Sequence, residues 1–435
     1  MNNYNLNSIL RVSCLFFSSM VLAQLTTNEK NEVIMNIGKI LDERYVIPET
    51  AETIKNNLMK NYRMGKYDTI SEGNELAFQL TKDLQLTSKD FHVNLNFSEE
   101  EISIQGMPSE RDIKEQQEWL DNKLKENNYG VKKLKILQGN VGYIEIPLFG
   151  PLDQTADTLV AAMQKIENTD ALILDLRGCM GSLEQNSVPF FASFFFKESV
   201  HLFDFYVRPT DTTKQFWTYL WLPYKKYLDK PVYILTSPCT FSGSEEIAYD
   251  FKQLKRAILV GETSRGGANP TERVVINKHF DMALPYMRSI NPITKTNWEG
   301  TGVVPDTSVK SYLALQTAHL LALDTILTAT TDVEQKKMLD NEIQKLKAYR
   351  PELRKVQFVL EGFDEAKDVA VSGSFNYWDT DLFMTKKGNK WVVETEFEPG
   401  TISYRFIVDG RWITDPGNPN NTDASEPPNS VLVVD

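Results

Sequence analysis

Apolar residues recur along this chain in three distinct patterns, and each pattern predicts a different kind of structure. From residue 28 to residue 86 they return every three to four positions, which places them on one face of a helix. Pro48 and the Met64-Gly65-Lys66 turn interrupt the pattern, so we predict about three helices here. The apolar positions are Val33, Ile34, Ile37, Ile40, Leu41, Ile54, Leu58, Leu76, Ala77 and Leu80.

From Gly139 to about Leu327, short continuous apolar runs alternate with amphipathic segments. A continuous apolar run is typical of a strand that is buried on both faces, and such runs separated by helices predict an α/β core. The expected strands are 141–146, 171–176 and 232–236, and the expected helices are 156–166, 187–196 and 245–254.

After residue 355 the pattern changes to short stretches in which apolar and polar residues alternate. The stretches include VQFVLEGF, DVAVSGSFNYW, TISYRFIVDGRW and SVLVVD, and turn residues separate them at regular intervals. This pattern predicts a β-sandwich. Two strongly charged segments, 110–127 and 332–355, predict a solvated helix and a helical linker.

The composition fits a chain of several globular domains without a basic surface. A length of 435 residues corresponds to about two to three domains, and 41% hydrophobic residues supply ample core material. The formal net charge of −12 argues against nucleic acid or an anionic membrane as a partner. Beyond the first residues, Cys179 and Cys239 are the cysteines of the chain, and whether they pair is open.

The first residues predict an export signal. Arg11 precedes the apolar run 12–22, and Val21-Leu22-Ala23 fits a cleavage site, so the mature chain is expected to begin at Gln24. The run is too short for a transmembrane helix. The alternative is that this run forms a first core helix of the domain. We therefore expect a periplasmic or extracellular protein without a transmembrane segment.

One serine has the surroundings of a nucleophile. Ser242 lies in a Thr-Phe-Ser-Gly-Ser turn between the predicted strand 232–236 and the predicted helix 245–254. There its hydroxyl would be exposed, and backbone N–H groups at the helix N-terminus could hold a developing oxyanion. The alternative is structural, because Ser242 and Glu245 also form a capping box.

Several spaced motifs resemble the tail-specific, or C-terminal processing, serine peptidases. TFSGSEE, LKRAILVGET and GGANP carry the resemblance, together with KDFHV, GNVGYIEIPLFG, ALILDLRG and NWEGTGVVPD, in the right order over roughly residues 30 to 310. The chain looks closest to the interphotoreceptor-retinoid-binding-protein-like and tricorn-like branch. The resemblance implies a crotonase-like βαβ-spiral core after an N-terminal helical bundle, with Ser242 as nucleophile. The interval between residues 92 and 141 leaves no room for the PDZ domain that many members carry.

The resemblance also implies the base that activates the serine. The tail-specific branch uses a lysine, but the matching position here is Gly267, and Arg265 cannot replace it because a guanidinium stays protonated. The tricorn-like branch uses a histidine, which maps to His92 in KDFHV. Its imidazole suits proton transfer near neutral pH. A serine that takes part in tricorn-like enzymes is replaced here by Phe91.

The remaining catalytic groups follow from the same resemblance. Glu299 in WEGTGV would support His92, and backbone N–H groups of Gly243 and Gly181 would form the oxyanion hole. The turn around Gly181 departs from the family, with Cys179 in place of asparagine and Ser182 in place of glycine. HxxxH and CxxC spacings are absent, so we expect neither metal nor cofactor.

The C-terminal region resembles the glycogen-binding module of the AMP-activated kinase β subunit. SGSFNYW, SYRFIVDGRWITDP and NSVLVV carry this resemblance. It implies that Trp378 and Trp412 stack on glucose rings, with Arg405 and Asn429 beside them. The alternative is that the two tryptophans fill the sandwich core or an interdomain contact.

These expectations combine into one proposal with alternatives. The expected regions are a signal peptide (1–23), a helical bundle (24–90), a peptidase core (91–330), a helical linker (331–355) and an immunoglobulin-like β-sandwich (356–435). We expect an exported serine endopeptidase that acts on peptides or proteins and whose last domain binds a glucan or a glycosylated partner. The alternative is a weak or inactive peptidase fold that binds a hydrophobic ligand or a glycan. A glycan-active enzyme with paired carboxylates ranks last, since no distinctive carboxylate pair is present.

Overall fold

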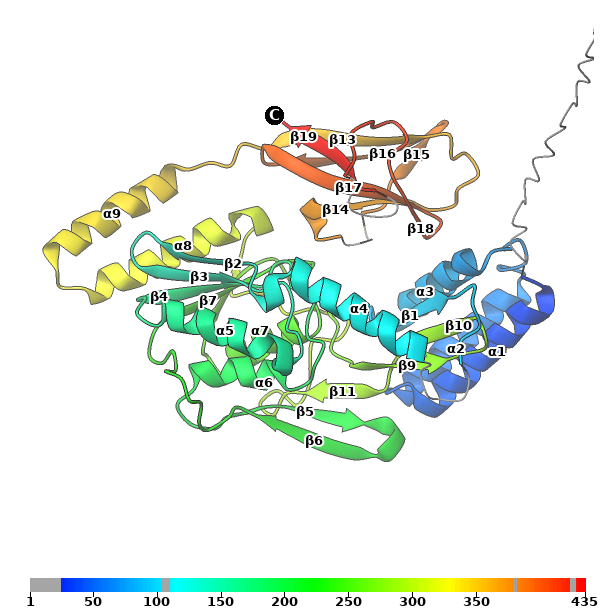
Figure 1. Ribbon diagram of the computed structural model, residues 1–435, viewed down its shortest axis with the longest axis horizontal. Helices are drawn as coiled ribbons and strands as arrows, with labels where there is room; N and C mark the ends of the chain where they lie inside the picture. The colour runs from blue at the N-terminus through cyan, green and yellow to red at the C-terminus, as the bar shows by residue number, and fades with distance from the viewer. Residues whose placement is uncertain (1–24, 104–109, 379, 381, 423–427) are drawn as a thin grey trace, which may run out of the picture.

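The computed structural model describes residues 25–103, 110–378, 380, 382–422 and 428–435 (Figure 1). The predicted signal segment, 1–23, lies outside these residues. Three helices open the described chain, as the apolar periodicity predicted: α1 (Thr27–Arg44), α2 (Pro48–Arg63) and α3 (Gly73–Ser88). In the described residues no helix is long and apolar enough to span a bilayer.

The three helices share a core with strands from much later in the chain. Strands β1 (Asn94–Phe97), β10 (Phe280–Pro285) and β9 (Thr271–Val275) form an antiparallel sheet in the order β1-β10-β9. Leu41 and Leu80 of the helices pack in one apolar cluster with Met282 of β10. The helical region is thus tied to the segment that follows residue 270.

The centre of the molecule is a six-stranded sheet with the order β12-β8-β7-β4-β3-β2. Only β2 runs antiparallel to its neighbour. The strands are β2 (Lys133–Leu137), β3 (Val141–Glu145), β4 (Ala171–Asp175), β7 (Val232–Thr236), β8 (Ile258–Gly261) and β12 (Thr307–Ser308). Because β3, β4, β7 and β8 are parallel, their carboxyl ends meet at one edge, where the loops of an α/β site usually lie.

Helices cover both faces of this sheet. Leu172 and Leu174 of β4 face a cluster with α5 (Leu152–Ile166), α6 (Ser187–Ala192) and α7 (Gly243–Gln253). Ala171 and Ile173, which alternate with them, face α8 (Ser311–Ala329) and α9 (Val333–Ala348). The predicted α/β core is confirmed, with nearly continuous apolar strands because both faces are buried.

Some predicted boundaries are wrong by several residues. The predicted helix 187–196 ends at Ala192 and continues as a 3-10 turn, Ser193–Phe195. The predicted charged helix ends at Ala348, close to Pro351, because the residue before a proline avoids helical backbone angles. Between β1 and β2 the described residues form the exposed helix α4 (Glu110–Glu126) and a 3-10 turn, with no PDZ domain among them.

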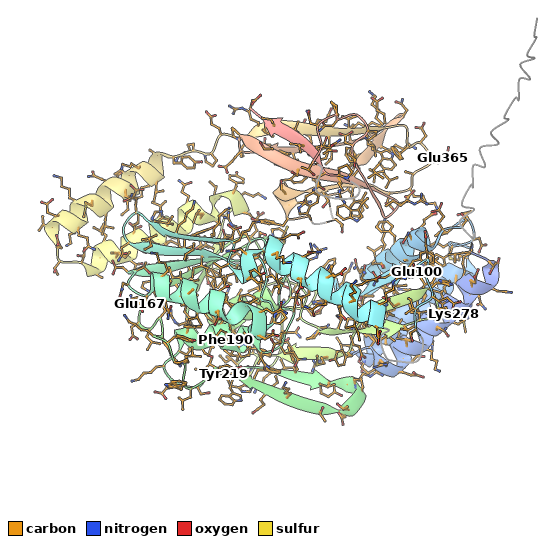
Figure 2. The ribbon with its side chains drawn as sticks, in the orientation of Figure 1. Glu100, Glu167, Phe190, Tyr219, Lys278 and Glu365 are labelled. Atoms are coloured by element: carbon orange, nitrogen blue, oxygen red, sulfur yellow. The ribbon has the colours of Figure 1, made fainter. Side chains whose placement is uncertain are left out.

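A smaller antiparallel sheet extends from the core beside α6. Its order is β11-β5-β6, with β5 (His201–Val207), β6 (Thr212–Trp217) and β11 (Met287–Ile290). Figure 2 places Phe190 of α6 next to Tyr219, whose ring centroid lies 6.3 Å away.

The C-terminal module consists of two antiparallel sheets. One has the order β13-β16-β15, and the other has the order β14-β17-β18 with β19 also paired to β17. Phe358, Val371 and Phe406 lie in the apolar cluster between the sheets. The predicted β-rich architecture is therefore confirmed. The strands are β13 (Arg354–Glu361), β14 (Val369–Gly373), β15 (Thr385–Lys387), β16 (Lys390–Phe397), β17 (Gly400–Val408), β18 (Arg411–Ile413) and β19 (Ser430–Val434).

The module is docked on the rest of the chain, with β14 and β18 toward α3 (Figure 1). Ion pairs join Lys82 to Asp368 at 2.7 Å, Lys367 to Glu75 at 2.9 Å, and Arg411 to Glu72.

A turn of the module also supports the loops at the carboxyl edge of the central sheet. A Cβ atom on Gly178 would lie 2.1 Å from the Tyr377 ring, so the module packs directly on this glycine. The Cys239 thiol lies 3.3 Å from the carbonyl oxygen of Asn376, to which it donates a hydrogen bond. Cys239 and Cys179 form no disulfide with each other, which answers the open question of their pairing.

Candidate active site

Ser242 lies in a strained turn between β7 and α7. Its backbone angles are φ 57° and ψ −125°, which are costly for a residue with a Cβ atom and typical of functional turns. Ser242 is half-buried and lines a cleft of about 380 Å³ at the carboxyl edge of the central sheet. His92 and Gly243 line the same cleft. Apolar side chains, among them Phe203 and Met287, form much of its wall.

Glu245 fixes the shape of this turn. One of its carboxylate oxygens accepts hydrogen bonds from Ser242 N–H (2.8 Å) and Gly267 N–H (2.9 Å), and the other from Gly266 N–H (2.7 Å) and the Ser264 hydroxyl. The carboxylate of the predicted capping box therefore also holds the 264–267 loop against the serine. This explains how the strained geometry of Ser242 is maintained.

His92 follows α3, which ends at Lys89 in a left-handed conformation (φ 61°). Its ring lies against Phe241, with centroids 4.4 Å apart, and 11% of its side chain is exposed. Neither ring nitrogen has a hydrogen-bond partner among the described residues. The structure brings His92 and Ser242 to one cleft, but the hydrogen bond between them is not formed.

The position matching the lysine of the tail-specific branch has no room for a side chain. A Cβ atom on Gly267 would lie 2.7 Å from Cε1 of His92 and 2.2 Å from the Phe241 ring. The imidazole thus fills the space that a residue-267 side chain would need. This packing favours His92 over any other base at that position.

Two carboxylates lie beside His92, and sequence reasoning named only Glu299. Asp90 Oδ1 is 3.6 Å from His92 Nδ1, whereas no Glu299 oxygen comes within 4.0 Å of a ring nitrogen. Donor atoms of Asp90, His92 and Glu299 all lie within 4.8 Å of one another. Asp90 is fully buried and accepts hydrogen bonds from His92 N–H (3.0 Å), the Tyr45 hydroxyl (3.2 Å) and the Asn269 amide (3.1 Å).

Glu299 differs from Asp90 in its electrostatic environment. Its Oε2 accepts the Ala268 N–H at 2.6 Å, while its buried Oε1 has no hydrogen-bond partner. Burial, and then the negative charge of Asp90, raise the pKa of Glu299 well above its usual range. Asp90, His92 and Glu299 together have the donor atoms to hold a metal ion. However, the oxygens of Asp90 are already occupied by protein donors, which fits a hydrogen-bonded catalytic group better.

Beside the predicted Gly243 and Gly181, the structure offers a further backbone donor close to Ser242, the N–H of Ser182. Burial raises the pKa of the Cys179 thiol to about 12, and the neighbouring Gly181 backbone N–H lowers it. Gly181 O and Leu183 N bond to Phe149, each at 2.9 Å. Because the peptide plane is trans, Ser182 N–H points away from Phe149.

Ser182 N–H reaches the nucleophile turn. A Cβ atom on Gly243 would lie 2.9 Å from Ser182 N, and one on Gly181 would lie 2.7 Å from Ser242 Cβ. Gly181 has φ 108°, so it supplies the left-handed turn that brings the next N–H to the cleft. The N–H groups of Gly243 and Ser182 are therefore the pair that geometry favours.

Two further buried carboxyl groups lie on α7 behind the cleft. Glu246 accepts the Ser289 hydroxyl at 2.8 Å, its Oε1 has no partner, and burial raises its pKa to about 8. Asp250 accepts the Asn291 amide at 3.0 Å, and burial and then Glu246 raise its pKa well above the usual range. Sequence reasoning missed both, because nothing in the helical pattern marks them as buried.

These carboxyl groups predict a stability that falls as pH rises. The unfolded chain releases the proton of Glu246 near the ordinary glutamate pKa of 4.5, whereas the folded protein keeps it up to about pH 8, so the folded state loses stability across this interval. Glu246→Gln removes this titration, so between pH 5.5 and pH 9 it is expected to lose less stability than the wild type, by about 1.4 kcal/mol for each pH unit between 5.5 and the raised pKa. Urea unfolding at the two pH values measures this. Exposed Glu118→Gln is the control, and equal pH dependence of Glu246→Gln and wild type would refute the prediction.

The four residues predicted to bind sugar lie on or beside one face of the β14-β17-β18 sheet. Trp412 pairs with Ile407 and Arg405 with Ser372, so both side chains point away from the sandwich core. The ring centroids of Trp378 and Trp412 are 6.4 Å apart. Asn429 directly precedes β19, whose first residue pairs with Tyr404, and this brings it next to Arg405. The tryptophans therefore do not fill the sandwich core.

Comparison with protein families finds three matches along the chain. Residues 140–309 match peptidase family S41, and residues 23–128 match the N-terminal domain of this peptidase in eukaryotic IRBP. Residues 356–435 match the glycogen recognition site of AMP-activated protein kinase.

The curated relatives match the C-terminal module alone. The subunit beta-2 of 5'-AMP-activated protein kinase is 38% identical in Homo sapiens over 61 residues, covering 14% of this chain and 22% of the relative. In Mus musculus it is 33% identical over 81 residues, covering 19% and 28%. The chain thus spans less than a third of the length of these relatives.

Solved structures resemble a larger part of the chain at low identity. Mature CPAF has a TM-score of 0.48 at 11% identity, covering 72% of this chain and 98% of that one. A putative peptidase from Parabacteroides merdae has a TM-score of 0.45 at 19% identity, covering 65% and 90%. The photosystem II D1 C-terminal processing protease has a TM-score of 0.41 at 13% identity, covering 66% and 95%.

Proposed function

Since residues 140–309 belong to peptidase family S41, and the chain is therefore a serine-type peptidase, we propose that it cleaves peptide bonds through an acyl-enzyme on Ser242. The observation that carries the proposal is the strained turn of Ser242, which shares a cleft with His92 and with the backbone of Gly243 and Ser182. The substrate would be a peptide or protein segment whose side chain enters the apolar cleft. In this proposal the core has the crotonase-like βαβ spiral and the module the immunoglobulin-like sandwich.

The reaction would proceed in two steps. Ser242 Oγ attacks the scissile carbonyl carbon while His92 takes the hydroxyl proton and then delivers it to the leaving amine. The carbonyl oxygen, now negative, lies between the N–H groups of Gly243 and Ser182. Water, deprotonated by His92, then attacks the acyl-enzyme and releases the acid and Ser242. His92 must turn toward Ser242 Oγ for this chemistry, since the two do not yet touch.

Asp90 and Glu299 would divide the support of His92 between them. Asp90 lies nearer to Nδ1 and keeps a fixed position through its buried donors, so we assign it the orientation of the imidazole and the stabilisation of its cation. Glu299, whose raised pKa favours its neutral form, would be the third member of the group formed with Asp90 and His92. The Ser-His-Glu triad inferred from sequence is thus extended by Asp90.

Labelling with a fluorophosphonate probe tests this proposal. The wild-type protein should be labelled, and Ser242→Ala and His92→Ala should not, because the probe reacts only with an activated serine. Ser199→Ala, which lies outside the cleft, should be labelled like the wild type. Circular dichroism melts confirm that each variant is folded. Labelling that persists in Ser242→Ala would reject Ser242 as the nucleophile.

A second function is favoured by the missing contact between Ser242 and His92 and by the apolar cleft wall. The chain would then be an inactive peptidase fold that binds a hydrophobic ligand or a glycan. A folded wild-type protein without labelling would support this second function.

The C-terminal module would bind an α-glucan or a glycan on a partner. The support is the match to a glycogen recognition site and the shared face of Trp378, Trp412, Arg405 and Asn429. Indole rings offer flat apolar surfaces to sugar rings, and the guanidinium and amide bind hydroxyl groups. The protein would act in the periplasm or outside the cell, as its first residues suggest.

A further inference from the structure

Part of the outer face of the β14-β17-β18 sheet, the face proposed to bind sugar, is covered, although Trp378 beside it is 37% exposed. Ala370, Ser372 and Ile407 share this face with Trp412, and at most 3% of each is exposed. Their alternation with core residues along β14 and β17 shows that the sandwich core does not bury them. Another part of the chain must cover the face.

The cover is α3 of the helical region. A Cβ atom on Gly410 would lie 2.7 Å from Phe78 Cβ, and the Lys82 ammonium lies 5.4 Å from the centroid of the Phe383 ring. The same ammonium pairs with Asp368 at 2.7 Å. These contacts hold the helix close to one part of the face and leave the rest open.

The open part is a cavity of about 810 Å³, within the range of ligand sites. Trp412 and Phe383 line it from the module. Asn74, Lys89 and Asn94 line it from the other side. Within the described part of the chain, the side chains of Asn74 and Lys89 make no hydrogen bond, so their polar groups are available. The Asn94 amide donates to Asn96 Oδ1 at 3.0 Å, and its carbonyl oxygen is left to accept a hydrogen bond from a sugar hydroxyl. Aromatic rings opposite amide and ammonium groups are the surface that an uncharged oligosaccharide needs.

The cavity and the catalytic cleft share a wall. Phe91 and Arg265 line the cavity, and His92 and Phe241 line the cleft. The Arg265 guanidinium lies 4.9 Å from the Phe91 ring centroid and 5.7 Å from that of Phe241. A ligand in the cavity would therefore be separated from the catalytic histidine by a single layer of side chains.

We propose that this cavity is a two-sided binding site for an α-1,4-glucan chain, built by the module and the helical region together. The inference rests on the proposed carbohydrate binding of the module and adds a second wall to it. Because Trp412 lines the cavity, a sugar stacked on that part of its ring would lie between the module and α3. Asn94 and Lys89 then meet the hydroxyl groups on the opposite edge of the sugar.

Calorimetric titration of the full chain with maltoheptaose tests the second wall. Trp412→Ala should abolish binding, and the double variant Lys89→Ala/Asn94→Ala should weaken it by about tenfold, as expected for two lost hydrogen bonds. Lys60→Ala, an exposed lysine of α2 outside the cavity, should bind like the wild type. Thr81→Trp, which fills the cavity from α3, should also block binding and gives an independent readout.

The outcomes separate the two proposals. Binding that is lost in Trp412→Ala but unchanged in Lys89→Ala/Asn94→Ala and in Thr81→Trp would overturn the two-sided site and leave the module as a sugar binder. No binding of maltoheptaose by a folded wild-type chain would overturn both. Thermal melts of each variant establish that a loss of binding is not a loss of folding.

Discussion

Ser242→Ala, His92→Ala and the double variant are all expected to lower kcat/KM to the same floor, roughly 10⁴-fold or more below the wild type. The physical reason is that the serine is a weak nucleophile without its base, and the base has no function without the serine. Removing the second group therefore costs almost nothing once the first is gone. Backbone N–H groups and substrate binding would account for the remaining rate. The measurement is kcat/KM on a peptide that the wild type cleaves.

A second histidine provides a matched control for this prediction. His201 also faces a carboxylate, Asp204, at 2.7 Å, and stacks on Trp217 with centroids 4.5 Å apart, but it lies outside the cleft. His201→Ala should leave kcat/KM within a few-fold of the wild type. Additive losses in the double variant would show that Ser242 and His92 do not act as one unit.

Asp90→Asn is expected to lower kcat by roughly 10³-fold with little change in KM, because the amide would donate to the ring and favour the wrong tautomer of His92. Glu299→Gln should lose less, about tenfold, since Glu299 lies farther from the ring and its raised pKa already favours the neutral form. Steady-state kinetics of the two variants decide between the carboxylates. A larger loss in Glu299→Gln would restore Glu299 as the main support of His92.

A buried carboxylate of the same region separates a catalytic effect from a loss of stability. Asp83 is also buried, it accepts hydrogen bonds from Tyr67 at 2.7 Å and Lys66 at 2.6 Å, and it does not line the cleft. Asp83→Asn should lower the melting temperature at least as much as Asp90→Asn and leave kcat unchanged. An equal loss of kcat in both variants would mean that folding, not orientation of His92, explains the effect.

The sequence was sufficient for features that depend on local pattern. The strand Val232–Thr236 and the helix after Ser242 follow from an apolar run, a turn and a capping residue within about twenty residues. The interruption at Pro48 is also local, and α2 begins there.

The groups that sequence reasoning missed depend on contacts between distant segments. Asp90 is only two residues from His92, but its burial comes from Tyr45 and Asn269, which no local pattern connects to it. The direction of the Ser182 N–H is set by Phe149, more than thirty residues earlier. Alternation along β18 could have placed Trp412 on the outer face, but not α3 over that face.

The docking of the module has a consequence for substrate choice. Three ion pairs and the packing of Tyr377 on Gly178 hold the module in a fixed position on the peptidase core. A chain bound to the module would therefore approach the catalytic cleft from one direction and at one distance. A flexibly linked module would raise the local concentration of many peptide bonds equally. A module in a fixed position favours the peptide bonds whose distance from the bound sugar matches the distance between module and cleft. The two domains would then set the distance between the bound sugar and the cleaved bond. A sugar-bearing substrate would be cut at a set number of residues from its glycan, whatever the sequence between.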